Sequence, residues 1–287
     1  MTTQTNDKIT AAMATLEEGI KNIATSGAWV EYLRAQALFH QYSFANTMLI
    51  LQQRPDATKV AGFHTWKKLG RHVKKGEKAL MILAPMVVAK KAQAEDESDA
   101  DEQKPQRVFG FKTVPVFDVS QTEGDPLPTA VRVLDGNASG DLFTRLAAFS
   151  EANGCPVRVR PIEGTMRGFY EPLRRRITVR EGMPLDQMAK TAAHEIAHSI
   201  LHHDPEVYAA HRGDCELEAE SVAFVVLNHF GVDSGGYSFA YVTGWQGGDA
   251  NAIKALKASA VRIQQTAKAI IEGIEKIPSG DSLSLSA

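Results

Sequence analysis

The sequence predicts an α+β protein built from two domains, and three observations support this class. The chain has 287 residues, of which 44% are hydrophobic, enough for two cores of ordinary size. Segments with helical periodicity and segments with strand-like periodicity both occur in each half. Residues 120–141 are rich in proline, glycine and aspartate, a composition typical of a domain boundary.

The first domain, residues 1–125, is expected to combine helices with a small sheet. Residues 6–52 have helical periodicity and stop before Pro55. An extended piece, a short basic helix and the turn "KKGEK" then lead into the apolar strand "ALMILAPMVV". The run "RVFGFKTVPVFDV" pairs with that strand across residues 95–102, of which six are acidic. Because like charges repel, this acidic tract is expected to be a solvated, disordered loop.

The second domain, residues 141–277, follows a linker at 126–140 and is expected to be mostly helical. It begins with a helix near 141–153 and the strands "PVRVRPI" and "RRRITVRE". The histidine-rich helix "AKTAAHEIAHSIL" comes next, followed by helices at about 213–230 and 250–275. Residues 278–287 are expected to be a frayed, disordered tail.

Composition limits where the protein works. A charged fraction of 23% and a net charge of −2 are typical of a soluble globular protein and exclude a disordered chain. The N-terminal residues lack the apolar segment of a secretory signal. The longest apolar run, residues 79–89, is too short to span a bilayer. Two cysteines, Cys155 and Cys215, cannot form a disulfide framework, so we expect a cytoplasmic protein without a membrane partner.

The helix containing His194, Glu195 and His198 indicates a metal site. Histidines four residues apart on a helix point the same way, and the H-E-x-x-H pattern uses both to hold zinc. The glutamate between them acts on a water molecule as a general base. The alternative is an ordinary amphipathic helix. His202 and His203 are predicted to be flanking polar residues and not ligands.

A catalytic zinc needs a third protein ligand and an open position, and the helix at about 213–230 supplies the candidates. Glu216 and Glu220 lie one turn apart on a flank of its apolar face, so either can reach inward. Glu218 points away from that face, which predicts a solvated surface residue. Cys215 is a minor candidate as a thiolate ligand, a small core cysteine being its ordinary role.

A second motif is strongly basic. Residues 59–78 contain seven basic residues and one acidic residue, a local charge of +6 that leaves −8 for the rest of the chain. Cations with interleaved rings are typical of proteins that bind single-stranded nucleic acid through phosphates and base stacking. The alternative is a solvated lysine-rich helix whose tryptophan packs inward. The DNA-binding candidates are Tyr42, Lys59, His64, Trp66, Lys67, Lys68, Arg71, Lys74, Lys75 and Lys78.

Several ordered motifs resemble ArdC-type antirestriction proteins. The stretch from "YSFANTMLILQQ" to "KKGEKALMILAP" is similar to the N-terminal domain of that family, and "VFDVSQTEG" resembles its end. The motifs "HEIAHSILH", "CELEAESVAFVV" and "YSFAYVTGW" resemble its metallopeptidase half. The resemblance extends over about residues 10–246.

The resemblance implies an N-terminal domain that binds single-stranded DNA and a C-terminal zincin-like metallopeptidase domain. It also implies a plasmid- or phage-associated protein that protects incoming DNA from host restriction, with an unidentified protein substrate near that DNA. The expected metal is zinc, with manganese as an alternative.

The resemblance to zincins also implies roles for individual residues. Glu216 is expected to be the third ligand, with Glu220 supporting a histidine or exchanging places with Glu216. The strand "RRRITVRE" is expected to receive the substrate backbone along its edge. Tyr241, or Tyr237, is the candidate proton donor to the oxyanion. The competing hypothesis is a non-catalytic protein that coats single-stranded DNA and holds a structural or vestigial metal.

Overall fold

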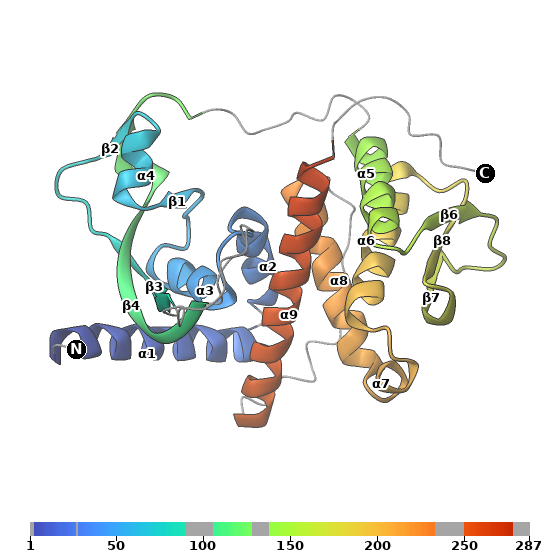
Figure 1. Ribbon diagram of the computed structural model, residues 1–287, viewed down its shortest axis with the longest axis horizontal. Helices are drawn as coiled ribbons and strands as arrows, with labels where there is room; N and C mark the ends of the chain where they lie inside the picture. The colour runs from blue at the N-terminus through green and yellow to red at the C-terminus, as the bar shows by residue number, and fades with distance from the viewer. Residues whose placement is uncertain (1–2, 27, 90–105, 128–137, 233–249, 278–287) are drawn as a thin grey trace, which may run out of the picture. The chain divides into compact units, whose positions relative to one another are not determined.

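A computed structural model of the chain describes residues 3–26, 28–89, 106–127, 138–232 and 250–277 (Figure 1). Its contacts divide the chain into two compact units. The N-terminal unit comprises residues 1–19 and 48–126, and the C-terminal unit comprises residues 20–47 and 127–287. The mixture of helix and sheet in two units is the α+β class that the sequence predicts. Among the described residues, no helix is long and apolar enough to cross a bilayer.

The division assigns residues 20–47 to the C-terminal unit, whereas the predicted first domain of residues 1–125 includes them. Helix α2 (Trp29–Leu38) explains this difference, because it packs against helix α8 (Arg212–His229). Trp29 is 1% exposed, and its indole N–H donates to the hydroxyl of Ser221 at 3.2 Å. Sequence periodicity shows that these residues are helical, but it does not show against which domain the helix packs.

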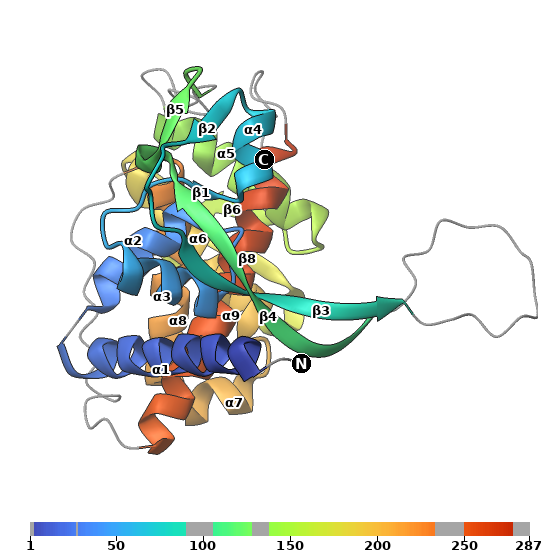
Figure 2. The same cartoon turned by 90° about the vertical axis from the view of Figure 1, so that its left-hand side faces the viewer.

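The N-terminal unit begins with part of helix α1 (Thr3–Ser26) and contains most of helix α3 (Phe44–Gln53). Strand β1 (Val60–Ala61), helix α4 (Phe63–Lys68) and strand β2 (Arg71–Val73) follow. Strands β3 (Leu80–Ala89) and β4 (Gln106–Asp118) form a long antiparallel ribbon (Figure 2). The predicted pairing of the two apolar runs is therefore confirmed, and the acidic tract lies outside the described residues.

The ribbon belongs to a sheet with the strand order β1-β4-β3, so β3 is an edge strand. Pro85, which cannot donate a backbone hydrogen bond, is tolerated there for that reason. Gln53 covers part of this edge. Its side-chain oxygen accepts from the backbone N–H of Met81 at 2.8 Å, and its side-chain nitrogen donates to the Met81 carbonyl at 2.9 Å. Strand β5 (Thr122–Gly124) pairs with β2 after a short 3-10 helix, η1 (Val119–Gln121).

Asp118 holds the end of β4 to the segment that enters β1. Its buried carboxylate accepts from the backbone N–H groups of Thr58 at 2.8 Å, Lys59 at 3.1 Å and Ser120 at 2.9 Å. Burial alone would raise the pKa of this carboxyl, but the hydrogen bonds outweigh burial and lower it. The aspartate of the motif "VFDVSQ" is thus a structural junction.

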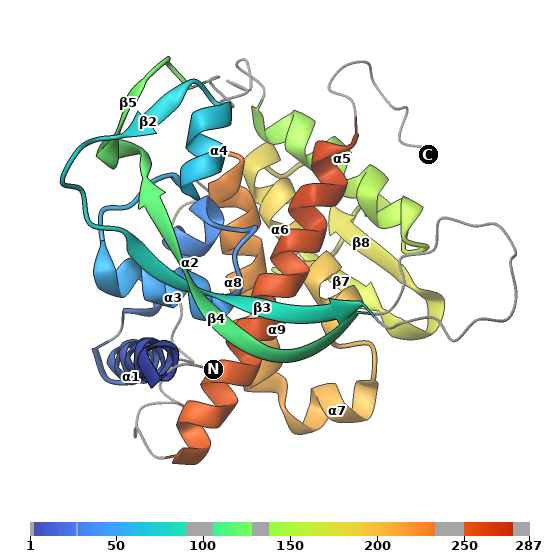
Figure 3. The ribbon, with the colours of Figure 1, turned by 60° about the vertical axis from the view of Figure 1, so that its left-hand side comes forward.

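In the C-terminal unit a small sheet lies beside the helices, at the edge of the unit (Figure 3). Helix α5 (Ala138–Ala152) precedes strand β6 (Val157–Arg160), strand β7 (Gly168–Glu171), the 3-10 helix η2 (Pro172–Arg174) and strand β8 (Arg176–Arg180). The strand order is β6-β8-β7, with β6 parallel and β7 antiparallel to β8. Helices α6 (Leu185–Leu201), α7 (Pro205–Ala210), α8 and α9 (Ala250–Glu275) complete the unit.

Helix α8 lies at the centre of this unit and packs against α2, α6 and α9. Its consecutive residues Ser221, Val222 and Ala223 are each 0% exposed, although neighbouring residues point about 100° apart around the helix. A helix that is buried on several sides has no single polar face, so a glutamate on it can lie in the interior instead of at the surface.

Candidate metal centre

Two histidines of α6 and one glutamate of α8 bring their donor atoms together. The Nε2 atoms of His194 and His198, one turn apart, are separated by 3.0 Å. Glu216 Oε2 lies 3.3 Å from Nε2 of His194 and 3.8 Å from Nε2 of His198. The packing of α6 on α8 creates this juxtaposition from residues that are far apart in the sequence.

The spacing of these three atoms fits a divalent transition metal. Ligands at about 2.0–2.1 Å from a tetrahedral zinc lie about 3.3 Å from one another. The three separations in the structure, 3.0, 3.3 and 3.8 Å, are distributed around that value. Two imidazole nitrogens and one carboxylate oxygen form a donor set that catalytic zinc accepts, with a fourth position open.

His194 is held from its other side by Glu220. The Nδ1 atom lies 3.2 Å from Glu220 Oε2, and Glu220 Oε1 lies 2.9 Å from Nζ of Lys190. Burial lowers the pKa of His194, but the carboxylates of Glu216 and Glu220 outweigh burial and raise it to about 9. The surrounding charges therefore favour a cation at this position, either a proton or a metal that replaces it.

His198 is held by a hydrogen-bonded chain that leads into the interior. Its Nδ1 lies 2.9 Å from Nδ1 of His202, whose Nε2 lies 3.1 Å from Oε2 of Glu218. A His198 that ligates through Nε2 carries its proton on Nδ1 and donates it to His202. His202 then carries its proton on Nε2 and donates to Glu218. The chain thus fixes the tautomer that presents a lone pair at the metal centre.

Glu218 is the fixed end of this chain. It is 3% exposed and accepts hydrogen bonds from the Ser259 hydroxyl at 2.6 Å and from the Arg262 guanidinium. Burial would raise the pKa of Glu218, but its bonds to His202, Arg262 and Ser259 outweigh burial and lower the pKa to about 2. Glu218 is therefore an anion that can support a donor histidine.

Two sequence predictions are wrong at this point. Glu218 is not a solvated surface residue, because the side of α8 that faces away from α6 is covered by α9. His202 is not a flanking polar residue, because it is 8% exposed and lies between His198 and Glu218. His203, by contrast, is exposed as expected. The spacing of four residues between His198 and His202 was the available signal for their contact.

Glu195 lies beside the donor atoms but is not one of them. It is 9% exposed, and burial raises the pKa of its carboxyl to about 7, with His194 opposing the rise and Glu216 adding to it. The backbone N–H of Tyr170, on β7, donates to this carboxylate. A carboxyl that titrates near neutral pH is suited to accept and return a proton.

Gly168 allows β7 to approach α6 closely enough for that contact. A Cβ atom at this position would lie 2.5 Å from Cγ2 of Thr191 and 2.9 Å from the carbonyl oxygen of Thr178. Any larger residue would displace β7 from the helix. Sequence reasoning missed β7, whose four residues are all half-buried and therefore show no alternation of exposed and buried positions.

A cavity of about 590 Å³ opens onto the metal centre. It is lined by α6, α7, α8 and β7, and its walls include Met166, Phe169, Leu173 and Arg212. β7 is the terminal strand of its sheet, whereas β8 is paired on both sides. The prediction that "RRRITVRE" offers a free edge to substrate is therefore wrong, and β7 is the strand that borders the cavity.

Tyr208 lies in the same cavity and was not among the sequence candidates. Its hydroxyl donates to Oε1 of Glu216 at 2.5 Å, and its ring packs against His198 with centroids 5.5 Å apart. Tyr241 and Tyr237 lie outside the described residues. Cys215 is buried, and burial, with nearby carboxylates, raises the pKa of its thiol to about 11, so it is a neutral core residue.

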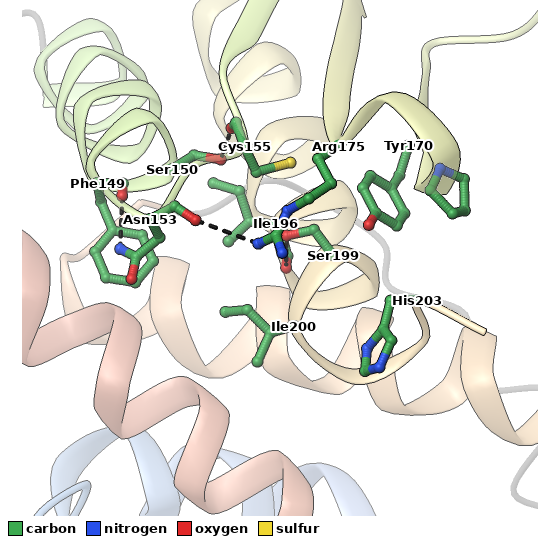
Figure 4. A pocket seen from close by; sticks show the side chains of 11 residues that line it. Phe149, Ser150, Asn153, Cys155, Tyr170, Arg175, Ile196, Ser199, Ile200 and His203 are labelled. Carbon is green, nitrogen blue, oxygen red and sulfur yellow. Dashed lines mark hydrogen bonds between the residues drawn. The ribbon is translucent and has the colours of Figure 1, made fainter.

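A second cavity, of about 450 Å³, borders α5, β7, η2 and α6 (Figure 4). Several of its polar groups already bond to one another: the Asn153 amide donates to the Phe149 carbonyl at 2.7 Å, and Arg175 donates to the Asn153 carbonyl at 3.4 Å. Among the described residues that line it, none belongs to the metal centre. The reacting groups therefore face the larger cavity.

The basic stretch lies in the N-terminal unit, and the structure separates the DNA-binding candidates into four groups. Trp66 is 2% exposed and its indole N–H donates to the Phe117 carbonyl at 2.9 Å, so its ring is a core group. Arg71 binds the carbonyls of Thr122, Gly124 and Asp125 and joins β2 to β5. Tyr42 belongs to the C-terminal unit. The remaining candidates are exposed: Lys59, His64, Lys67, Lys68, Lys74, Lys75 and Lys78.

Aromatic side chains outside the list of predicted DNA-binding residues are exposed in the same unit. Phe63, at the start of α4, is 48% exposed and packs edge to face on His64 with centroids 5.8 Å apart. Phe109 and Phe111 on β4 are 59% and 50% exposed. Of the two roles that the sequence left open for Trp66, the structure supports the inward-packed one, because its ring fills the core, so Trp66 is not an exposed stacking ring. Phe63, Phe109 and Phe111 are the exposed rings.

Comparison with known proteins matches the two halves of the chain to two different families. Residues 1–117 match the family described as the N-terminal domain of anti-restriction factor ArdC. Residues 151–227 match the peptidase M78 family, described as the IrrE N-terminal-like domain. An uncharacterized protein of Bacillus anthracis is 25% identical over 283 residues, covering 86% of this chain and 48% of that protein. The chain thus spans about half the length of this relative.

Two crystal structures of the antirestriction ArdC protein from the R388 plasmid have a similar fold. The metal-free structure is 20% identical, with a TM-score of 0.50, over 82% of this chain and 85% of that one. The Mn(II)-bound structure is 19% identical, with a TM-score of 0.53, over 93% of this chain and 99% of that one. The resemblance and the α+β, two-domain architecture predicted from the sequence are confirmed.

Proposed function

We propose, from the membership of this chain in the ArdC-type antirestriction family, that it holds a catalytic divalent metal and hydrolyses peptide bonds close to single-stranded DNA. The observation that carries the proposal is the triangle of His194 Nε2, His198 Nε2 and Glu216 Oε2, with buried Glu195 beside it. A purely structural metal site has no need for a fourth residue whose carboxyl lies on the same cavity without binding the metal.

His194, His198 and Glu216 would hold the metal, and Glu195 would handle the proton. A divalent cation in this position would act as a Lewis acid toward water and a peptide carbonyl. Glu195 is suited to take a proton from the attacking water and to return it to the leaving amine. The Tyr170 N–H keeps the Glu195 carboxylate at the border of the cavity.

Tyr208 is a second candidate for the proton donor to the oxyanion, beside Tyr241, which lies outside the described residues. The Tyr208 hydroxyl bonds to Glu216 and lines the cavity, so a small rotation directs the O–H toward an oxyanion formed there. Arg212 lines the same wall and supplies a permanent positive charge. A substrate backbone would lie along β7, which borders the cavity.

Zinc is the metal that we propose, with manganese as the alternative. Two imidazoles and one carboxylate in near-tetrahedral spacing favour zinc. The R388 protein binds Mn(II) in its crystal structure, which supports a site that accepts either ion.

We also propose that the N-terminal unit binds single-stranded DNA. The exposed lysines of residues 59–78 supply cations for phosphates, and Phe63, Phe109 and Phe111 supply exposed rings for bases. A stacked base contributes about 1–3 kcal/mol in proteins of this kind. Because Phe111 is exposed and Trp66 is a core residue, Phe111→Ala tests base stacking more directly than any change at Trp66.

The two activities together explain a role in protecting incoming DNA from restriction. Binding to the same strand as a target protein raises its effective concentration, toward the millimolar range for short flexible tethers. The natural target is a protein that meets entering DNA. The competing function, a protein that protects DNA by coating it, uses the lysines and needs no Glu195.

Protection of transferred DNA in a restricting host distinguishes these functions. We compare wild type with Glu195→Gln, with Lys67→Glu/Lys68→Glu, and with Lys254→Glu/Lys257→Glu, which changes the net charge equally in the C-terminal unit. Hydrolysis predicts that Glu195→Gln loses protection while keeping metal and DNA affinity. If Glu195→Gln protects fully and only the Lys67/Lys68 variant fails, the protein acts by binding alone.

A further inference from the structure

A second cluster of metal-binding side chains lies away from the cavity, where three helices end. His40 follows α2 by two residues, His229 is the last residue of α8, and Glu275 is the last residue of α9. One donor atom from each lies within 4.8 Å of the other two. α8 packs against both α2 and α9, and the three helices lie together in Figure 1.

His229 is fixed in an orientation suited to a metal ligand. Its Nδ1 lies 3.0 Å from the carbonyl oxygen of Ala37, and a carbonyl can only accept, so Nδ1 carries a proton. In the neutral ring Nε2 then presents a lone pair, 3.3 Å from Oε1 of Glu275. Backbone carbonyls commonly fix ligating histidines in this way. A lone pair facing a carboxylate is unfavourable unless a cation lies between them.

The environment of His40 shows that the cluster is more than an ion pair between His229 and Glu275. It is 8% exposed, and neither ring nitrogen has a hydrogen-bond partner among the described residues. Its ring packs edge to face on His229, with centroids 4.5 Å apart. A protonated His229 paired with Glu275 would satisfy those two groups and leave both nitrogens of His40 buried without a partner, which is costly.

The electrostatic setting also favours a positive charge. Helix C-termini carry a partial negative charge, and here α8 and α9 end at ligand residues while α2 ends two residues before His40. The negative charge of Glu275 adds to theirs. Glu275 is half exposed at the end of its helix, so its carboxylate has room to close the spacing to the value of about 3.3 Å that a tetrahedral zinc requires.

We propose that His40, His229 and Glu275 form a second site for a divalent transition metal, with zinc matching its two-imidazole, one-carboxylate donor set. The metal ties the ends of α2, α8 and α9 together. Because α2 and His40 belong to residues 20–47, this site joins that segment to the later helices of the C-terminal unit. The role is structural, with water completing the coordination.

Zinc stoichiometry of the full chain, measured by equilibrium dialysis and elemental analysis, tests the proposal. His229→Asn is the sharpest variant, because the asparagine amide keeps the donor to Ala37 and removes Nε2. We expect two zinc ions per chain in wild type, one in His229→Asn, one in His194→Ala/His198→Ala, and none in the triple variant. His203→Asn, at an exposed histidine outside both clusters, should retain two.

Stability measurements give a second readout. Zinc should raise the melting temperature of His194→Ala/His198→Ala, and His229→Asn or Glu275→Gln should abolish the rise. His40→Phe keeps the ring and removes its nitrogens, so it should fold but bind one zinc fewer. The proposal is overturned if the His194→Ala/His198→Ala protein binds no zinc, or if its zinc survives His229→Asn.

Discussion

Replacing His202 with phenylalanine tests the hydrogen-bonded chain behind the metal centre. The change keeps a planar ring of similar size between His198 and Glu218 and removes both ring nitrogens. His198 then has no acceptor for its Nδ1 proton, 2.9 Å from the former nitrogen. Glu218 keeps Ser259 and Arg262 as partners, so its buried charge stays compensated and the fold is expected to survive.

Two separate estimates give the size of the effect. A buried N–H left without a partner costs about 1–3 kcal/mol. Loss of an outer partner of a ligating histidine typically weakens metal binding about 10–100-fold, equivalent to about 1.4–2.8 kcal/mol. The estimates agree, so His202→Phe is expected to weaken zinc binding about 10–100-fold. Glu218→Gln should cost less, because its amide oxygen still accepts from His202.

The assay is a competition titration with a chromophoric zinc chelator, carried out in the His229→Asn background so that a single site responds. His203→Phe is the matched control, since it makes the same substitution at the neighbouring exposed histidine and should leave affinity unchanged. Circular dichroism confirms folding. An unchanged zinc affinity in His202→Phe would show that His198 needs no support from His202, and the inferred tautomer would be wrong.

Three further predictions concern the surrounding fold and the DNA-binding surface. Gly168→Ala should reduce peptidase activity while leaving zinc content normal, because the added Cβ moves β7 and the Tyr170 N–H away from Glu195. Normal activity in this variant would show that β7 does not position Glu195. Trp66→Ala should destabilise the N-terminal unit by about 3–5 kcal/mol in hydrogen exchange of the full chain, whereas a stacking role would leave exchange unchanged. Lys67→Glu/Lys68→Glu should flatten the salt dependence of binding to single-stranded DNA, which declines by about 0.7 log units per phosphate contacted and per tenfold rise in salt. An unaltered slope would place the DNA elsewhere.

Local patterns in the sequence predicted much of the fold. The spacing of His194 and His198 places both rings on one side of any helix, whatever surrounds it. The paired strands β3 and β4 follow from two apolar runs on either side of a charged tract. These features depend on neighbours in the chain, so periodicity was sufficient to find them.

Features that depend on distant segments were not predictable from periodicity. Glu218 was placed on the surface because a helix is normally assumed to have one buried face, and α8 is covered on several sides. Trp66 was ambiguous between core and surface until Phe117 supplied its acceptor. The short strand β7 and the residue Tyr208 have no periodic signal, and only the tertiary structure brings them to the cavity.

The position of a bound metal tests the central claim most directly. Crystals of the full chain grown with zinc, with anomalous diffraction collected on both sides of the zinc absorption edge, locate the ion independently of any assumed ligands. We predict a peak about 2.0–2.2 Å from His194 Nε2, His198 Nε2 and a Glu216 oxygen, with Glu195 outside the coordination sphere. A peak bound by Glu220 in place of Glu216, or no peak at these histidines, would contradict the account.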